Sequence, residues 1–202
     1  MEAERLHGMG PAWELGGLTA GPAELQPGTA QLRAEVLRRQ TPFLARRVLL
    51  AESLRASEGT PWWILRRARA TAHLLNRCPI AIRKGERLVG AHPATPAVDS
   101  QAVAQAEAYL ARQSFHVRAA SGQVALDLVT ILHHGLDGLL AQLRRLRAEL
   151  RLLDPHRAER RTFYEAAEIA LEGFQRFVLR YALLARQQAA AEAARRDELL
   201  AT

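Results

Sequence analysis

The chain has 202 residues and a formal net charge of +7, and 49% of its residues are hydrophobic but only 5% aromatic. This length suffices for one folded domain, and abundant alanine with few aromatic residues favours helices over an all-β fold. Lys84 is the only lysine, and the arginines are interleaved with acidic residues along the chain. That pattern is typical of solvated helix faces, so we do not expect a nucleic-acid partner.

Cys78 is the only cysteine, which excludes a disulfide framework and indicates a cytoplasmic protein. No apolar segment has the length that a bilayer-spanning helix needs, and the first residues lack the pattern of a secretory signal. We therefore expect no membrane partner.

Glycine and proline interrupt residues 1–28 so often that we expect a disordered tail there, followed by a single domain over residues 29–202. In that domain, apolar positions first recur at helical spacing from Thr29. Pro42 should split or kink this first helical segment, and Gly59 ends it.

Thr60 is the predicted N-cap, and Pro61 the predicted first residue, of a helix that reaches residue 76. Two short apolar stretches then flank a glycine-containing turn within residues 79–89, which predicts a small hairpin or an extended excursion. A short helix is predicted over residues 101–112.

The clearest helical signal is a row of seven leucines with unbroken 4-3-4-3 spacing, which predicts one long helix with an apolar stripe. These residues are Leu132, Leu136, Leu139, Leu143, Leu146, Leu150 and Leu153. Asp154 should end this helix and cap the next one, with Pro155 as the first helical residue.

The next helix repeats the spacing and is predicted to run from Pro155 to Leu200, a length of about 70 Å. Its stripe consists of Phe163, Ala167, Ala170, Phe174, Phe177, Tyr181 and Leu184. Two striped helices joined by a tight turn predict an antiparallel hairpin. Its length indicates a bundle or the scaffold of something larger, and the part beyond Leu184 should fray or await a partner.

No residue stands out as catalytic or metal-binding. His133 and His134 are adjacent, so their side chains point about 100 degrees apart on a helix and lack the further ligands that a metal needs. Cys78 follows a helix rather than preceding one, which favours packing over a nucleophilic thiol.

Two other pairs of residues receive structural interpretations. Gly135 and Gly138 lie within the leucine-striped helix and should permit close helix approach rather than cradle a phosphate. Asp127 and Asp137 are too far apart for an acid–base pair and are interpreted as solvated helix carboxylates.

Four groups of short motifs follow one another along residues 29–202. They are Arg46-Arg47 with Ala51-Glu52-Ser53, Gly59-Thr60-Pro61 and Arg66-Arg67-Ala68; Pro79-Ile80-Ala81-Ile82 with Gly85-Glu86-Arg87-Leu88-Val89-Gly90; Gly122 to Asp127 with Ile131 to Gly138; and Phe163-Tyr164-Glu165-Ala166 with Arg180-Tyr181-Ala182 and Arg195 to Leu200. In this order they resemble the N-terminal part of the pyruvate formate-lyase domain of glycyl radical enzymes.

The resemblance implies helices that pack around a β/α barrel in a full enzyme, with the dehydratase and C–N or C–O lyase branches most similar. It also implies a glycyl radical, installed by an S-adenosylmethionine-dependent activating enzyme, and a catalytic Cys in a central hairpin. Both positions would lie beyond Thr202, and Cys78 does not match that Cys. Gln123 also departs from the family pattern, which has a His there.

We therefore expect a mainly α fold, a long helical hairpin plus shorter helices, that corresponds to the N-terminal helical portion of a glycyl radical enzyme. It would be truncated before the catalytic residues and inactive by itself, with the remainder of a split enzyme or a second copy of itself as partner. The alternative is a non-catalytic helical interaction module.

Overall fold

The structure is a computed structural model that describes residues 30, 33–34, 44–86, 89, 97–113 and 127–201. All regular structure in these ranges is helical, which confirms the predicted mainly α fold and its long hairpin. The predicted tail over residues 1–28 and the helix start at Thr29 lie outside the described residues. The elements are α2 (Leu44–Ala56), α3 (Trp63–Arg77), α4 (Ser100–Ala111), α5 (Leu128–Ala148), α6 (Arg157–Ala191), the 3-10 helix η1 (Ala193–Arg195) and α7 (Arg196–Leu200).

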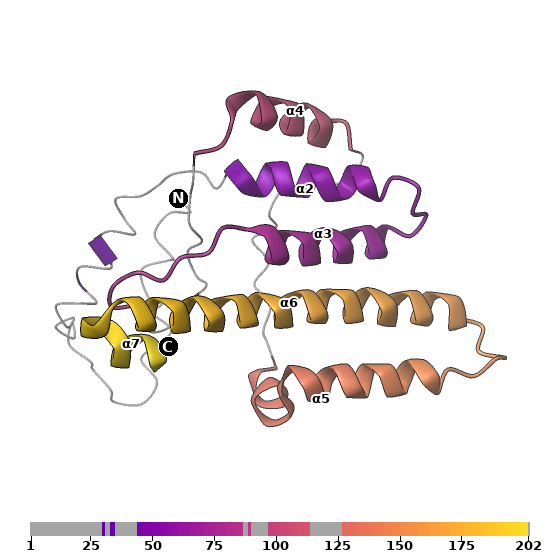
Figure 1. Cartoon of the computed structure of the whole chain (residues 1–202). Helices are drawn as coiled ribbons and strands as arrows, with labels where there is room; N and C mark the ends of the chain where they lie inside the picture. The colour runs from indigo at the N-terminus through magenta and orange to yellow at the C-terminus, as the bar shows by residue number, and fades with distance from the viewer. Residues whose placement is uncertain are drawn as a thin grey trace, which may run out of the picture.

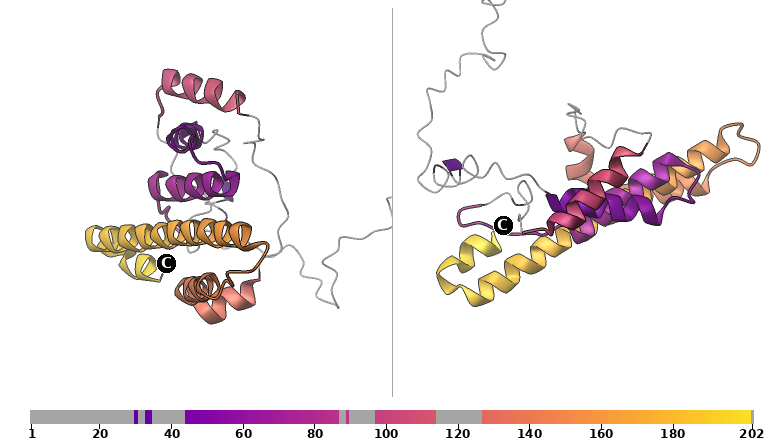
Figure 2. Two further views of the ribbon diagram at one scale, coloured as in Figure 1. Left: turned by 90° about the vertical axis from the view of Figure 1, so that its right-hand side faces the viewer. Right: turned by 90° about the horizontal axis from the view of Figure 1, so that it is seen from above.

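The helices form a single row in the order α4, α2, α3, α6, α5, so neighbours in space are only partly neighbours in sequence (Figure 1). Among the described helices, the main row makes contacts only between adjacent members, while α7 and η1 pack on α6. In the left view of Figure 2 the helices of the row again lie one above another, with α3, α4 and α6 seen from the side and α2 seen along its axis. Within the described ranges, therefore, no second layer of helices covers the two broad faces of this row.

The buried side chains of the described residues form three separate clusters rather than one continuous core. One joins α2, α3 and α4 around Leu54, a second joins α3 to α6 around Leu65, and a third joins α6 to α7 around Leu199. Leu54 and Leu199 are the largest side chains that the described part of the chain buries completely. No described helix combines the length and apolar character that a membrane crossing requires.

The boundary between α2 and α3 differs from the sequence prediction by two residues. α3 begins at Trp63 with Trp62 at its N-cap and without a capping side chain. The backbone N–H of Thr60 donates to the carbonyl of Ser57 (2.9 Å), and the Thr60 hydroxyl accepts a hydrogen bond from Arg69 (2.8 Å). The predicted roles of Thr60 as N-cap and Pro61 as first helical residue are therefore wrong, because Thr60 still belongs to the turn that closes α2.

The segment after α3 is an extended excursion, one of the two predicted alternatives. No strand pairing occurs in its described part, and the N–H of Glu86 donates to the carbonyl of Arg83 (3.1 Å) across a turn with Gly85 at φ 80°. α4 follows as predicted, and the side chain of Asp99 caps it by accepting from the N–H groups of Gln101 and Ala102.

The leucine helix, α5, is shorter than predicted and is kinked. Gly135 adopts φ 62° and ψ −179° inside it, a backbone conformation that is essentially restricted to glycine. Leu132 precedes this kink and is 82% exposed. The helix ends at Ala148, and Leu153, which follows that end, is 97% exposed. The prediction of one unbroken stripe is therefore wrong at both ends, and only its central part packs against α6.

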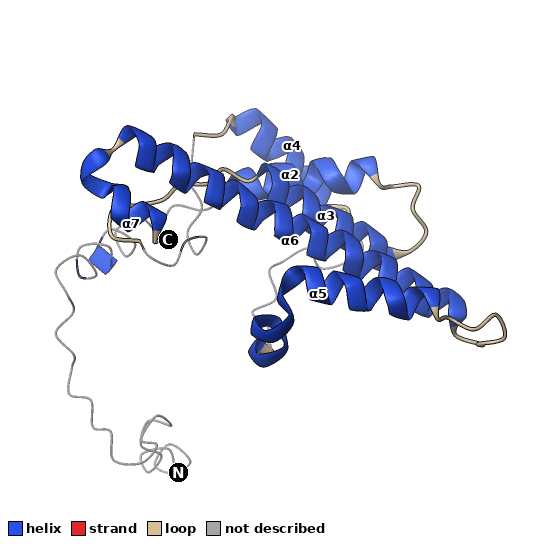
Figure 3. Ribbon diagram, turned by 60° about the horizontal axis from the view of Figure 1, so that its bottom comes forward, coloured by secondary structure: helices blue, strands red, loops and turns tan. Residues whose placement is uncertain are grey.

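The first turn of α6 begins at Arg157 rather than at Pro155. The carboxylate of Asp154 accepts from the N–H of His156 (2.9 Å), and its carbonyl accepts from the N–H of Arg157 (3.0 Å). Asp154 and Pro155 thus form the hairpin turn, visible in Figure 3 between α5 and α6, instead of the predicted N-cap and first helical position.

The far end of α6 also differs from the prediction. The helix ends at Ala191, and the chain folds back so that Leu199 of α7 is buried against Tyr181, Ala185 and Ala189. The predicted single helix to Leu200 and the frayed end are therefore wrong.

The predicted stripe on α6 only partly matches its buried face. The structure buries mostly small residues there, whereas Phe163 and Phe174 of the stripe remain 53% and 43% exposed. The buried residues of α6 are Thr162, Ala166, Gly173, Tyr181, Ala185 and Ala189. Ala166 and Gly173 lie against α3, where the close approach of the two helices requires small side chains, whereas Tyr181, Ala185 and Ala189 pack with Leu199 of α7.

Candidate functional site

The residues that the sequence offered as possible ligands do not come together. His133 and His134 are both exposed near the Gly135 kink. No group of three or more His, Cys, Asp or Glu side chains in the described ranges is arranged to hold a metal ion. The two histidines are therefore surface residues of α5 with no metal cluster around them in that part of the chain.

Cys78 lies at the C-terminal end of α3, where its side chain is buried and its thiol approaches the carbonyl of Leu75 (3.7 Å). Arg180 of α6 donates to the carbonyls of Leu75 (2.6 Å) and Cys78 (2.7 Å) and comes within 4.0 Å of the Cys78 sulfur. A guanidinium at this position satisfies carbonyls that the helix end leaves unpaired and complements the helix dipole. Cys78 thus has the packing position that the sequence predicted.

Asp127 and Asp137 are both exposed and lie on α5, far apart. The Asp127 carboxylate caps α5 by accepting from the N–H (3.0 Å) and hydroxyl (2.6 Å) of Thr130, and these hydrogen bonds lower the pKa of Asp127. Asp137 accepts from the side-chain amide of Gln175 on α6 (2.5 Å). Both carboxylates are therefore exposed groups with structural hydrogen bonds: Asp127 caps its own helix, and Asp137 links α5 to α6.

The predicted role of the two α5 glycines in close helix approach is wrong. A Cβ on Gly135 would meet no atom within 4 Å, and a Cβ on Gly138 would meet only His134 of the same helix. The close approach occurs instead at Gly173 of α6, where a Cβ would lie 2.7 Å from both Cα and Cβ of Ala72. The sequence signal for it was a glycine inside a helical pattern, which the stripe of larger residues obscured.

Ion pairs join α5 to α6 along the hairpin. Arg144 donates to Glu168 (2.6 Å) and to Glu172 (2.8 Å), and Arg147 also donates to Glu168. The hydrogen bond that Arg144 donates to Glu168, followed by Coulomb attraction to the same carboxylate, raises the pKa of Arg144. The side chain of Glu168 is only 14% exposed, so it forms the centre of this network.

A second polar corner ties the excursion after α3 to the C-terminal helices. The Glu198 carboxylate accepts from the N–H of Gly85 (2.7 Å) and from Arg195 (3.3 Å), and Arg195 also donates to the carbonyl of Arg83 (3.2 Å). The hydrogen bond from Gly85 is the largest cause of the lowered pKa of Glu198.

Beneath this corner the carboxylate of Glu86 is buried and accepts from the N–H of Arg83 (3.0 Å). Burial, then the nearby Glu86 and Cys78, raise the pKa of Tyr181.

These clusters hold helices together, and none of them pairs a nucleophile with a general base. Their functional importance is positional: Arg180 fixes the end of α3, Glu168 fixes the hairpin, and Glu198 fixes the C-terminal fold-back. Sequence reasoning did not find these roles because each joins residues that are 21 to 113 positions apart.

Comparison with known proteins shows where this helical arrangement occurs. The structure superposes on a protein from the study of 1,2-propanediol dehydration in Roseburia inulinivorans with a TM-score of 0.66 and 25% identity, over 77% of this chain and 27% of that one. It also superposes on the glycerol-bound B12-independent glycerol dehydratase from Clostridium butyricum with a TM-score of 0.64 and 22% identity, over 84% of this chain and 30% of that one. The chain therefore spans less than a third of the length of each.

A family model described as pyruvate formate lyase-like matches residues 96–201, which is more than half of the chain. The matched part runs through α4, α5, α6 and α7, and the structural superpositions extend the similarity over more of the chain. Both structural neighbours are glycyl radical enzymes of the same family. The chain belongs to the pyruvate formate lyase-like family.

Proposed function

We propose that this chain supplies the helical scaffold of a glycyl radical enzyme of the dehydratase or lyase type, and that the radical chemistry needs residues other than these 202. The cytoplasmic setting indicated by the lone cysteine belongs to the same proposal. The observation that carries it is the single row of helices, which exposes apolar side chains on a face that a larger enzyme would cover.

The exposed apolar side chains concentrate on α6 beyond the part that α5 covers. α5 runs antiparallel to α6 and accompanies it from Glu168 to Gln175, where Asp137 pairs near the α5 kink. From Phe174, one residue before this contact, onward, large side chains of α6 are 43% to 56% exposed: Phe174, Val178, Leu179 and Leu183. A group of exposed large apolar residues on a helix indicates a protein contact. Phe174 and Leu183 are nine residues apart, so these side chains spread over about half the circumference of α6. We refer to these four residues as the open face of α6.

The described residues do not fit a site for the glycyl radical itself. The family chemistry pairs a radical on a backbone glycine with a cysteine close to it, whereas the Cys78 thiol is buried against the end of α3 with Leu75 and Arg180 as its partners. No hydrogen-transfer step can be built on this cysteine. The position of Cys78 therefore supports a scaffold role for the described part of the chain.

The proposal is tested by treating the purified chain with an S-adenosylmethionine-dependent activating enzyme and recording an electron paramagnetic resonance spectrum. We expect no glycyl radical signal and no conversion of 1,2-propanediol or glycerol. The dehydratase from Clostridium butyricum, activated in parallel, is the positive control. A radical signal from the chain alone would overturn the proposal.

A second candidate function is a free-standing helical interaction module, in which the open face of α6 binds another copy of the chain. The same exposed residues favour it, because a symmetric dimer would also cover them. The two functions differ in what the isolated chain does in solution: a module forms a closed dimer, whereas a scaffold without its remainder does not.

A further inference from the structure

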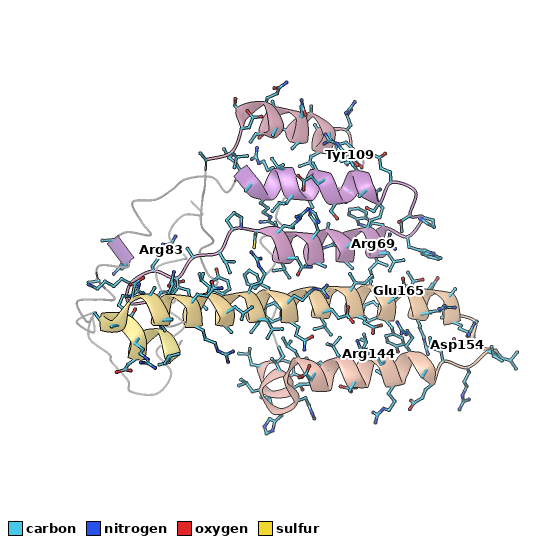
Figure 4. The ribbon with its side chains drawn as sticks, in the orientation of Figure 1. Arg69, Arg83, Tyr109, Arg144, Asp154 and Glu165 are labelled. Atoms are coloured by element: carbon cyan, nitrogen blue, oxygen red, sulfur yellow. The ribbon has the colours of Figure 1, made fainter. Side chains whose placement is uncertain are left out.

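A positively charged hollow of about 490 Å³ lies at the closed end of the α5–α6 hairpin. Four arginines and one glutamate line it together with small and apolar residues: Arg144, Arg147, Ala148, Leu150, Arg157, Arg161 and Glu165. Figure 4 labels Arg144 on α5, Glu165 on α6 and Asp154 in the turn that joins the two helices. Guanidinium groups that share one hollow repel each other unless anions offset their charge.

Two of the four arginines are already neutralised by the protein. Arg144 and Arg147 both donate to Glu168, and Arg144 also pairs with Glu172. They lie near the C-terminus of α5, where the helix dipole favours a positive charge. These two residues form a wall of the hollow that is stable without any ligand.

The other two arginines have no such compensation. Arg157 and Arg161 form no ion pair with any carboxylate in the described part of the chain, and the Nε of Arg157 is buried without a hydrogen-bond partner there. Arg160 on the same turn differs, because it pairs with Asp154 (3.0 Å).

The N-terminus of α6 adds to the uncompensated positive charge of the hollow. Arg157 is the first residue of α6 and Arg161 lies one turn later, so both cations face the positive end of the helix dipole. The N-cap residue His156 supplies no capping side chain. Two guanidinium groups without ion pairs in the described part of the chain and a helix N-terminus without a capping side chain both favour an anion at this place.

We propose that this hollow binds an anion that carries phosphate groups, with Arg157 and Arg161 as its principal ligands. A phosphate group supplies two negative charges and three acceptor oxygens, which matches two adjacent guanidinium groups better than a single carboxylate does. Glu165 opposes the bound anion by like-charge repulsion. The site is independent of the proposed scaffold role, since neither radical chemistry nor the open face of α6 enters the argument.

Isothermal titration calorimetry of the full chain with inorganic pyrophosphate at low ionic strength tests the proposal. We expect Arg157→Gln with Arg161→Gln to weaken binding at least tenfold, because each charge-assisted hydrogen bond contributes that order of affinity. Glu165→Gln should strengthen binding about threefold, since it removes a nearby negative charge. Arg186→Gln, an exposed arginine of α6 outside the hollow, is the matched control and should bind as the unaltered chain does.

Circular dichroism checks that each variant keeps its helix content, and the gain from Glu165→Gln cannot arise from misfolding. The proposal is overturned if pyrophosphate does not bind, or if the arginine double variant binds it as tightly as the Arg186→Gln control. Equal affinity for pyrophosphate and for citrate would overturn the assignment to phosphate and leave a general polyanion site.

Discussion

Gly173 determines how closely α3 and α6 approach. A Cβ at this position would lie 2.7 Å from the backbone Cα of Ala72, a contact that only a shift of a helix can relieve. We predict that Gly173→Ala lowers the free energy of unfolding by about 1–3 kcal/mol, in spite of the better helix propensity of alanine. Urea unfolding followed by circular dichroism measures the change.

The matched control is Gly59→Ala. Gly59 lies in the turn after α2, where an added Cβ meets no atom within 4 Å and φ is not positive. This change should leave stability unaltered or raise it by up to about 1 kcal/mol. A Gly173→Ala variant that is as stable as Gly59→Ala would show that α3 and α6 are not in close contact.

Glu198 gives the C-terminal corner a pH dependence. Its pKa is lower in the folded chain than in the unfolded one, so its contribution is present above the unfolded pKa and is lost as the pH falls through the folded pKa. We predict that Glu198→Gln costs about 1 kcal/mol at pH 7. This difference should shrink as the pH falls below the ordinary Glu pKa of about 4.3 and disappear once the pH is below the lowered pKa of the folded chain. Thermal unfolding across this pH range measures both.

Glu149→Gln serves as the control for this titration, because Glu149 is exposed and its one ion pair among the described residues joins it to Arg145, one turn earlier in the chain. Its effect on stability should be small at every pH. A Glu198→Gln penalty that stays constant from pH 7 to pH 3 would contradict the assigned role of the carboxylate charge.

At the scale of the secondary structure elements, Arg180 links the end of α3 to the middle of α6. Its two hydrogen bonds to the carbonyls of Leu75 and Cys78 replace the partners that the last turn of α3 lacks. We predict that Arg180→Ala lowers the free energy of unfolding by about 2 kcal/mol, since carbonyls become unsatisfied. Hydrogen exchange should show the loss of protection concentrated in the last turn of α3.

The control for Arg180 is Arg186→Ala, on the same helix but exposed. This variant should exchange like the unaltered chain. If Arg180→Ala raised exchange uniformly over α3 and α6, the residue would stabilise the helix pair generally rather than the end of α3.

The existence of the helices could be predicted from sequence, but their ends could not. The helical periodicity located α3, α4 and the α5–α6 hairpin, because local spacing of apolar residues determines a helix face. The ends depended on hydrogen bonds that spacing does not reveal, such as the Thr60 N–H to Ser57 and the Asp154 carboxylate to His156. The Gly135 kink was missed because an isolated glycine in a helical pattern is also compatible with a straight helix.

The polar contacts between elements were also outside the reach of sequence reasoning. Glu198 meets Gly85 across 113 positions and Arg180 meets Cys78 across 102. Nothing in the local sequence at either end specifies the partner. Arg180 and Glu198 occur in the motifs that resemble the family, but the motifs do not indicate what these side chains contact. Their roles follow from the packing of α3, α6 and α7.

For the whole molecule, the arrangement in one layer is the feature that no periodicity could show. Each helix contacts its neighbours in the row, and the buried residues fall into three clusters instead of a shared core. This explains why large side chains of the predicted α6 stripe stay exposed: the face they occupy has no helix opposite it. The chain spans less than a third of the length of the two enzymes on which it superposes, and under the proposed scaffold role the rest of such an enzyme would cover this layer.

The scaffold account predicts that the open face of α6 is not complementary to itself, so that two copies of the chain associate through it only non-specifically. Val178→Glu with Leu183→Glu should therefore remove non-specific association of the chain, because charge on an exposed apolar patch opposes contact. Leu152→Glu is the matched control, since Leu152 is also exposed but lies in the hairpin turn away from that face.

Sedimentation velocity over a range of protein concentrations compares these three chains. The scaffold account predicts a broad, concentration-dependent distribution for the unaltered chain and for Leu152→Glu, and a single monomer for Val178→Glu with Leu183→Glu. A discrete dimer that persists on dilution and dissociates only in the double variant would contradict it and establish a self-associating helical module instead.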